Sequence, residues 1–212
     1  MGDLNWDVIA RYQDAIVWGL ALALKLAAFG LAGGVVLGLL AAFGRTSGRR
    51  WLRAPATAYV ELIRNVPLLL LIFIFYFGFP MFAFRTFPDA VAEVLVLEGE
   101  GSVIVALAIY GGAYLAEVFR AGINAVPKGQ SEASYAIGMR KNQVMRLVLI
   151  PQAVTIMLPA IISQCVIVLK DSALGLIIGY QDLTAQGRLI AEFVDHTIVP
   201  LLVVALIYIA LN

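Results

Sequence analysis

Long apolar stretches separated by short polar segments dominate the chain. Five such stretches, at about residues 15–44, 66–84, 103–123, 147–169 and 197–212, contain few or no charged side chains. A helix needs about 20 apolar residues to cross the hydrocarbon core of a bilayer. The pattern therefore predicts an all-α polytopic membrane protein with five transmembrane helices. Because the fifth stretch is shorter than a full span, we expect the natural protein to continue beyond Asn212.

The polar segments that separate these stretches alternate in charge. Segments 45–65 and 124–146 carry net charges of +4 and +3, whereas segments 1–14, 85–102 and 170–196 carry −2, −3 and −2. Loops rich in Lys and Arg face the cytoplasm. The alternation therefore places the N-terminus outside and both basic loops inside, including the loop between the third and fourth spans.

Composition excludes several classes of protein. Hydrophobic residues make up 62% of the 212 residues and charged residues 14%, against about 45–50% and about 25% in soluble domains. A net charge of +1 provides no field for a nucleic acid. The single cysteine, Cys165, and the single histidine, His196, provide neither a disulfide framework nor a zinc cluster. We therefore expect no nucleic-acid partner and no metal site.

Glycine and proline spacing indicates how the spans pack. Gly30, Gly34 and Gly38 recur every four residues and share one helix face. Small residues allow close helix approach within membranes, so this face is expected to pack against another helix of the chain, with a dimer interface as the alternative. Pro151 and Pro159 favour kinks in the fourth span.

The segment 127–151 has the pattern of a compact element at the cytoplasmic surface. It reads as a short polar helix, a turn at a glycine, and a second helix that enters the membrane. Ser131 is a candidate N-cap, and Gly138 suits the position just after the helix end, where the chain turns. In a chain without a soluble domain, such an element predicts a docking surface.

This segment resembles the EAA loop of ABC importer permeases. The residues that carry the match, at the family's spacing, are Glu132, Ala133, Ser134, Gly138, Val148, Ile150 and Pro151. Segments 59–67, 113–123 and 169–184 are similar to those of the polar amino acid branch, above all its glutamate/aspartate and glutamine members. The resemblance implies that residues 1–212 form one ABC importer transmembrane domain, in the cytoplasmic (inner) membrane of a prokaryote.

The resemblance also implies a division of labour among several chains. The chain is expected to move polar amino acids by alternating access, driven by a separate ATPase dimer that binds ATP and Mg²⁺. The residues expected to couple to that ATPase are Glu132, Ala133, Ser134, Gly138, Arg140 and Pro151. An external substrate-binding protein and a second permease subunit, identical or homologous, complete the expected assembly. Since the chain has no phosphate-binding loop motif, we expect neither a bound cofactor nor enzymatic activity on it.

Polar residues in or beside the spans are candidates for the substrate path. They are Glu61, Arg64, Glu117, Arg120, Ser163, Gln164, Lys170, Asp171 and Ser172. Alternatives remain open, because Glu117 and Arg120 can form an i,i+3 ion pair and the two polar residues of the fourth span can bond a neighbouring helix. Lys170 and Asp171 could bind a zwitterion or pair with each other. The apolar run 173–179 is too short to cross the membrane and is expected to re-enter it.

Two other classes of membrane protein compete with this interpretation. A secondary, ion-coupled transporter usually shows inverted repeats, and no second copy of the Gly30–Gly38 or Glu132–Pro151 pattern occurs. An intramembrane enzyme needs convergent catalytic groups at membrane depth, which the pattern does not provide. Dependence of uptake on ATP discriminates the importer from the ion-coupled transporter.

Overall fold

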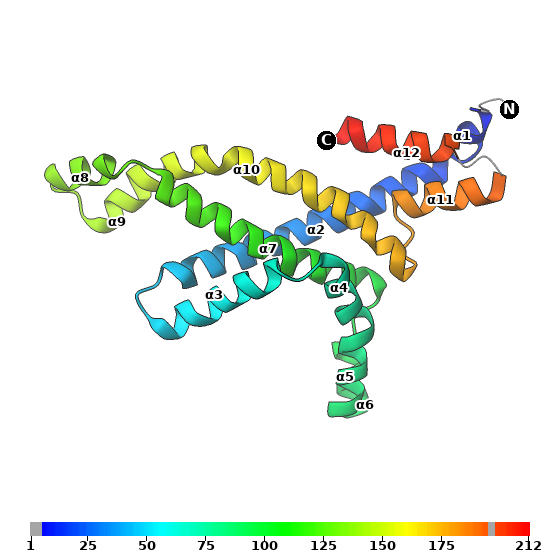
Figure 1. Cartoon of the computed structure of the whole chain (residues 1–212), viewed down its shortest axis with the longest axis horizontal. Helices are drawn as coiled ribbons and strands as arrows, with labels where there is room; N and C mark the ends of the chain where they lie inside the picture. Colours follow the sequence, from blue (N-terminus) through cyan, green and yellow to red (C-terminus); the bar gives the residue numbers. More distant parts are fainter. Residues whose placement is uncertain (1–5, 195–197) are drawn as a thin grey trace. The chain divides into compact units, whose positions relative to one another are not determined.

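The computed structural model describes residues 6–194 and 198–212, so His196 lies outside the described residues. The regular secondary structure of these ranges is helical (Figure 1). The α-helices are α1 (Asp7–Arg11), α2 (Gln13–Thr46), α3 (Arg50–Arg64), α4 (Leu68–Phe73), α5 (Phe79–Thr86), α6 (Asp89–Leu95), α7 (Gly99–Ala125), α8 (Lys128–Ala136), α9 (Lys141–Gln143), α10 (Ile150–Asp171), α11 (Leu183–Val194) and α12 (Ile198–Leu211). Two π-helical segments, Ile74–Gly78 and Val144–Leu149, and a 3₁₀ helix, Ser172–Ile178, connect some of them.

The predicted all-α membrane architecture is confirmed. Among the described residues, four helical segments are long and apolar enough to cross a bilayer: Gln13–Thr46, Leu68–Thr86, Gly99–Ala125 and Lys141–Ile178. The first, third and fourth of these segments contain the predicted ranges 15–44, 103–123 and 147–169, and the second overlaps the predicted range 66–84 but begins at Leu68. The predicted fifth span coincides with α12, an apolar helix of 14 residues, which is shorter than the 20 or so residues that a crossing needs. The count of five spans and the orientation remain predictions.

Both π-helical segments end shortly before a proline. The segment Ile74–Gly78 precedes Pro80, and Val144–Leu149 precedes Pro151. Proline has no N–H and its ring clashes with the carbonyl four residues earlier, so a wider turn before it relieves the clash. The expected disturbance at Pro151 therefore takes the form of a π turn. By contrast, α10 continues through Pro159, so this proline does not end the helix.

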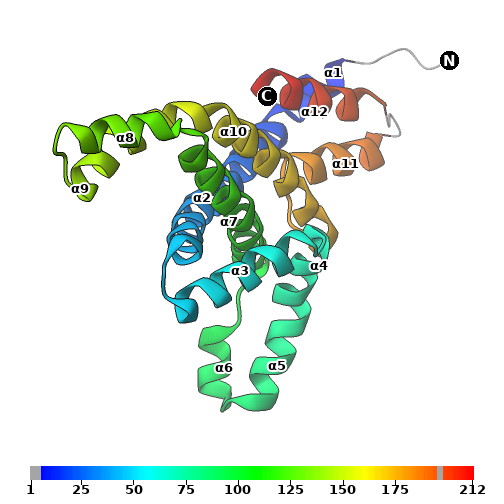
Figure 2. The ribbon, with the colours of Figure 1, turned by 60° about the vertical axis from the view of Figure 1, so that its left-hand side comes forward.

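The helices divide into two compact units, of which the first comprises residues 1–31, 67–107 and 166–212. Its core contains buried residues of α1, the first half of α2, α11 and α12: Val8, Ile16, Ala23, Leu183, Ile190 and Val204. Gly187 of α11 faces Val204 so closely that a Cβ atom would lie 2.5 Å from that side chain. In the same unit, α5 and α6 form an antiparallel hairpin (Figure 2).

The apolar run 173–179, which follows α10, lies almost entirely in the 3₁₀ helix Ser172–Ile178. The prediction that this run re-enters the membrane remains a prediction.

The second unit comprises residues 32–66 and 108–165. Here α3 lies antiparallel to the end of α2 (Figure 1), and the glycine face of α2 packs against α7. A Cβ atom on Gly34 would lie 3.2 Å from the backbone nitrogen of Gly112, and one on Gly38 would lie 2.9 Å from Leu115 Cβ. The predicted role of these glycines in packing within the chain is thus confirmed. The close contact holds α7 in place, and α7 carries the charged residues discussed below.

Candidate functional site

The segment 127–151, in which a docking surface is predicted and which we call the docking loop, forms a helix–turn–helix element. Helix α8 ends at Ala136, and Gly138 follows in the left-handed region with φ of 83°. The N–H of Met139 donates to the carbonyl of Ser134 at 3.1 Å, and the N–H of Gly138 donates to that of Tyr135 at 2.9 Å. These two hydrogen bonds define a Schellman motif, in which glycine is favoured after the helix end. The predicted role of Gly138 at the turn is confirmed.

The start of α8 differs from the prediction. The helix begins at Lys128 with Pro127 in the N-cap position, three residues earlier than expected. The Ser131 hydroxyl lies within the helix and donates to the Lys128 carbonyl at 2.8 Å, so the prediction of Ser131 as N-cap is wrong. The physical reason is the proline, whose restricted backbone is compatible with the start of a helix and whose missing N–H is not needed there.

The loop exposes two large side chains near its turn, one aliphatic and one aromatic. Ile137 is 79% exposed and Tyr135 is 50% exposed, and the predicted coupling residues Glu132, Ala133 and Arg140 are also exposed. Ser134 differs, because its side chain is buried and its hydroxyl donates to the Gln130 carbonyl at 2.6 Å. Ser134 therefore stabilises α8 from its inner side.

The inner side of the docking loop contacts the start of α10 and the π-helical segment that precedes it. Helix α8 packs against the π-helical segment Val144–Leu149, and the amide Nε2 of Gln152 donates to Oε1 of Gln130 at 3.2 Å. At its other end, α8 follows α7 after only Val126 and Pro127. The element is thus connected directly to both α7 and α10, with the predicted coupling residue Pro151 at the second connection.

Three arginines surround one carboxylate on α7. Glu117 accepts hydrogen bonds at Oε2 from Arg120 Nε at 3.0 Å and Nη2 at 2.8 Å. Its Oε1 pairs with Arg45 from the end of α2, and Arg64 Nη1 of α3 lies 3.7 Å from the same oxygen. The Arg64 guanidinium also lies 5.3 Å from the centre of the Tyr114 ring, a cation–π distance. The predicted i,i+3 pair is therefore part of a cluster that ties α7 to α2 and α3.

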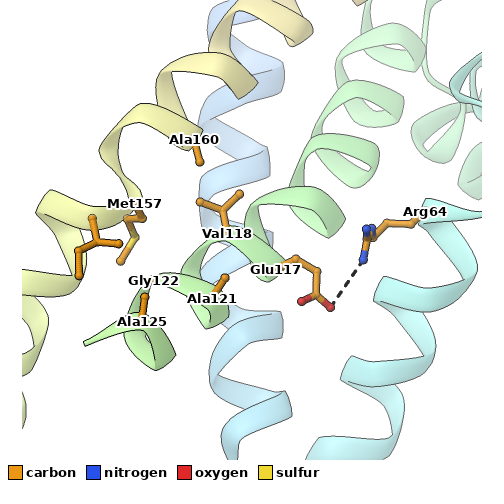
Figure 3. A pocket seen from close by; sticks show the side chains of 9 residues that line it. Arg64, Glu117, Val118, Ala121, Gly122, Ala125, Met157 and Ala160 are labelled. Atoms are coloured by element: carbon orange, nitrogen blue, oxygen red, sulfur yellow. Dashed lines mark ion pairs between the residues drawn. The ribbon is translucent and has the colours of Figure 1, made fainter. Parts of the chain in front are cut away.

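A cavity of about 380 Å³ adjoins this cluster (Figure 3). Arg64 and Glu117 are the charged residues of its lining, and the other lining side chains come from α7 and α10. In the close-up, Glu117 points toward Arg64, whereas Met157 and Ala160 of α10 approach from the opposite side (Figure 3). The structure thus brings together three predicted path residues, Arg64, Glu117 and Arg120. Arg45 was missed by the sequence analysis, which counted it only as a loop charge.

The other predicted path residues lie apart from this cavity. Glu61 is exposed beside Arg50 and Arg53 in a second hollow, of about 430 Å³. The hydroxyls of Ser163 and Ser172 donate to the carbonyls of Pro159 and Leu169, at 3.0 and 2.7 Å. These hydroxyls are therefore satisfied within their own segment of chain.

Three further candidates lie in the later part of α10. Gln164 is buried with 6% exposure. Lys170 is exposed and Asp171 is half-buried, and their side chains form no ion pair in the described part of the chain. Their participation in a substrate path remains a prediction.

A buried acid precedes α11 in the first unit. Asp182 is fully buried and caps the helix, because its Oδ1 accepts the Ala185 N–H at 3.0 Å. Burial raises the pKa of Asp182 to about 6, against the opposing effect of the hydrogen bonds to the charged form. In the sequence, Asp182 counts among the charges of segment 170–196 and falls in the segment 169–184 that carries the resemblance, and its role as a cap was not predicted, although an acid directly before an amphipathic helix is a recognisable cap signal.

The folded protein is expected to be less stable above pH 6 because of Asp182. A pKa raised from 3.8 to about 6 means that the folded chain holds this proton more tightly than the unfolded chain does. The contribution of Asp182 to the free energy of unfolding is therefore fully present below pH 4. It is lost as the pH rises through 6, and the loss amounts to at most about 3 kcal/mol. Asp182→Asn keeps the capping oxygen without the charge. Its melting temperature should exceed that of the wild type at pH 8, and the gap should close near pH 4.

The exposed acid Asp89, at the start of α6, provides a matched control for this measurement. Melting curves of Asp89→Asn in detergent, between pH 4 and pH 8, should follow those of the wild type. A constant gap between Asp182→Asn and the wild type across this range would contradict the assignment.

Residues 34–212 match the family model described as binding-protein-dependent transport system inner membrane component. The chain belongs to this family. It is a membrane transport component, and the ion-coupled alternative is not favoured. The resemblance to ABC importer permeases seen in the docking loop is therefore confirmed at the level of the family.

Individual relatives of this permease family agree with that assignment. The chain is 40% identical over 210 residues to the glutamate transport system permease protein GluD of Corynebacterium glutamicum, covering 99% of this chain and 72% of GluD. It is 34% identical over 184 residues to the glutamine transport system permease protein GlnP of Escherichia coli K12, covering 87% and 80%. A crystal structure of an amino acid ABC transporter with histidines superposes with a TM-score of 0.87 at 33% identity, covering 98% and 92%.

Proposed function

We propose that this permease is the membrane-spanning subunit of an ATP-driven importer for amino acids of the glutamate and glutamine type. The family places the chain in systems that work with a binding protein, and the two relatives described above are permeases for glutamate and for glutamine. The proposed partners are an ATPase dimer that binds ATP and Mg²⁺, an external binding protein and a second permease subunit.

The docking loop is the observation on which the coupling proposal rests. Ile137 and Tyr135 expose apolar surface at the tip of a polar helix, and isolated apolar side chains surrounded by polar ones are typical centres of protein interfaces. The tip is held by a Schellman turn, so its shape exists before the ATPase binds. We assign the ATPase contact to this tip, with Glu132 at its rim.

Motion of the ATPase would reach the spans through short connections. Two residues separate α8 from α7, and α8 packs on the segment that leads into α10. The Glu117 cluster in turn ties α7 to α2 and α3. A displacement of α8 is thus expected to move α7 and α10 together, and with them the walls of the cavity that contains Arg64 and Glu117.

Replacing Ile137 with aspartate is expected to uncouple the transporter. The side chain is 79% exposed, so the change should leave the permease folded. A charge placed in the interface centre should weaken ATPase association by at least about 2 kcal/mol, or roughly thirtyfold. Glu132→Lys should weaken it less, because exposed rim charges contribute little. Co-purification with the ATPase and ATP-driven uptake of glutamate and glutamine into proteoliposomes measure both effects.

Charge reversal at Glu192 is the matched control. This exposed acid lies on α11 in the other unit, where it pairs with Arg188. Glu192→Lys should retain the ATPase and its coupled uptake. The docking proposal fails if Ile137→Asp retains them too, and uptake driven by an ion gradient without the ATPase would contradict the importer itself.

A further inference from the structure

A further cavity of the second unit, distinct from the two described above, has no part in the proposed function. It measures about 370 Å³ and lies among α2, α7, the π-helical segment Val144–Leu149 and α10. Its walls are apolar, with Leu39 and Phe43 from α2, Phe119 from α7, and Val154 from α10 among them. The volume falls in the range of about 300–1,000 Å³ that is usual for ligand sites. Three of the residues that line the cavity, Leu39, Phe43 and Val154, are also exposed at the surface of the protein.

Two polar residues, Thr46 and Arg120, are among the residues that line this cavity. Thr46 is the last residue of α2, and Arg120 lies five residues before the end of α7. Both helices lead into the two basic segments, 45–65 and 124–146. The cavity therefore has apolar walls and a cationic lining residue, Arg120, on a helix that leads into a basic segment.

Arg120 belongs to a cluster that carries more positive charge than Glu117 neutralises, and the other two arginines of this cluster are not among the residues that line the cavity. Arg45, Arg64 and Arg120 share the single carboxylate of Glu117, which leaves a net charge of +2 on the cluster. Arg120 donates through Nε and Nη2, and its Nη1 has no hydrogen-bond acceptor among the described residues. Uncompensated charge beside an apolar environment is costly, so an additional anion next to Arg120 would be stabilised.

We propose that this cavity binds one acyl chain of an anionic phospholipid, with the phosphate of its headgroup next to Arg120. A membrane-spanning chain meets such lipids at its basic face, and basic pockets between transmembrane helices on that side are known to bind anionic headgroups. A helix of the second permease subunit could fill the apolar walls. It would not supply a negative charge next to Arg120, unless it carried an acid. Charge complementarity therefore favours the lipid.

Photo-crosslinking of the complete importer in nanodiscs tests this site. The nanodiscs contain phosphatidylcholine and a minor fraction of phosphatidylglycerol, and either lipid carries a diazirine on its acyl chain. The phosphatidylglycerol probe should label residues 150–161 about fivefold more than the phosphatidylcholine probe, which corresponds to one arginine acting on an anionic headgroup. Arg120→Gln should remove this preference, and Arg120→Lys should retain most of it.

Two substitutions on α10 separate the cavity from the general lipid surface. Val154 lines the cavity and is 46% exposed, whereas Leu158, one turn later, is 49% exposed and lies outside both cavities of this region. Val154→Phe should reduce labelling of 150–161 to the level of other exposed helices, and Leu158→Phe should leave it unchanged. Equal labelling by the two probes, labelling unaffected by Val154→Phe, or crosslinks that place the second permease subunit in the cavity would each overturn the proposal.

Discussion

Replacing Glu117 with glutamine is expected to abolish transport and to lower the stability of the permease by about 3 kcal/mol. The glutamate is the shared counter-ion of three arginines, and the side chains of Glu117 and Arg45 are only 20% and 14% exposed. Removing one partner of a buried ion pair costs about 3–5 kcal/mol, because the remaining charge stays uncompensated. The lower end applies here, since Arg64 and Arg120 are more than 40% exposed and partly screened by water. Thermal melting in detergent and uptake into proteoliposomes measure the two effects.

The exposed pair Arg188–Glu192 is the control for this substitution. Both side chains are more than half exposed, and an exposed i,i+4 pair contributes only about 0.3–0.5 kcal/mol. Glu192→Gln should therefore leave melting and transport close to those of the wild type. In a double-mutant cycle, Arg45→Gln should cost much less in a Glu117→Gln background than in the wild type. Additive costs, or a fully active Glu117→Gln permease, would show that the arginines are neutralised elsewhere.

The elements that the sequence predicted correctly depend on neighbours along the chain. The spans follow from local hydrophobicity, and the helical segments Gln13–Thr46 and Gly99–Ala125 contain the predicted ranges 15–44 and 103–123. The turn at Gly138 follows from a glycine directly after a short polar helix, and its φ is positive as expected. The i,i+3 pair of Glu117 and Arg120 follows from helical spacing. Such features need no knowledge of the tertiary structure.

The features that escaped prediction depend on distant or competing contacts. Arg45 reaches Glu117 across 72 positions of sequence, and no local pattern links the two. Ser131 is a strong cap residue by type, yet Pro127 begins the helix earlier. The π turns before Pro80 and Pro151 show that a proline can be accommodated without ending a helix. The sequence thus singled out Arg64, Glu117 and Arg120, which the structure brings together, but not Arg45, which also pairs with Glu117. The part of these residues in a substrate path remains a prediction.

Substitutions at Gly138 are expected to impair coupling in proportion to the backbone strain they introduce. Apart from the residues next to it in the chain, no residue has an atom within 4 Å of the place where a Cβ would stand, so contact with the rest of the protein contributes nothing. The cost comes from φ of 83°, a conformation that costs a non-glycine residue roughly 1–2 kcal/mol and a β-branched residue more. Gly138→Asn should be tolerated, Gly138→Ala should reduce ATP-driven uptake, and Gly138→Val should displace the tip containing Ile137 and uncouple the ATPase. ATPase stimulation by the reconstituted permease measures the order.

Gly129 is the matched control for Gly138, because it lies in the same helix α8 and also has no atom within 4 Å of a prospective Cβ. Its φ is not positive, so Gly129→Ala should stabilise α8 by up to about 1 kcal/mol through helix propensity. Coupling in Gly129→Ala should therefore equal or exceed that of the wild type. If Gly138→Val couples as well as Gly129→Ala, the Schellman turn does not determine the direction of the docking tip. If Gly138→Asn fails as completely as Gly138→Val, the glycine is required for contact with the ATPase, because asparagine satisfies the backbone but adds a side chain.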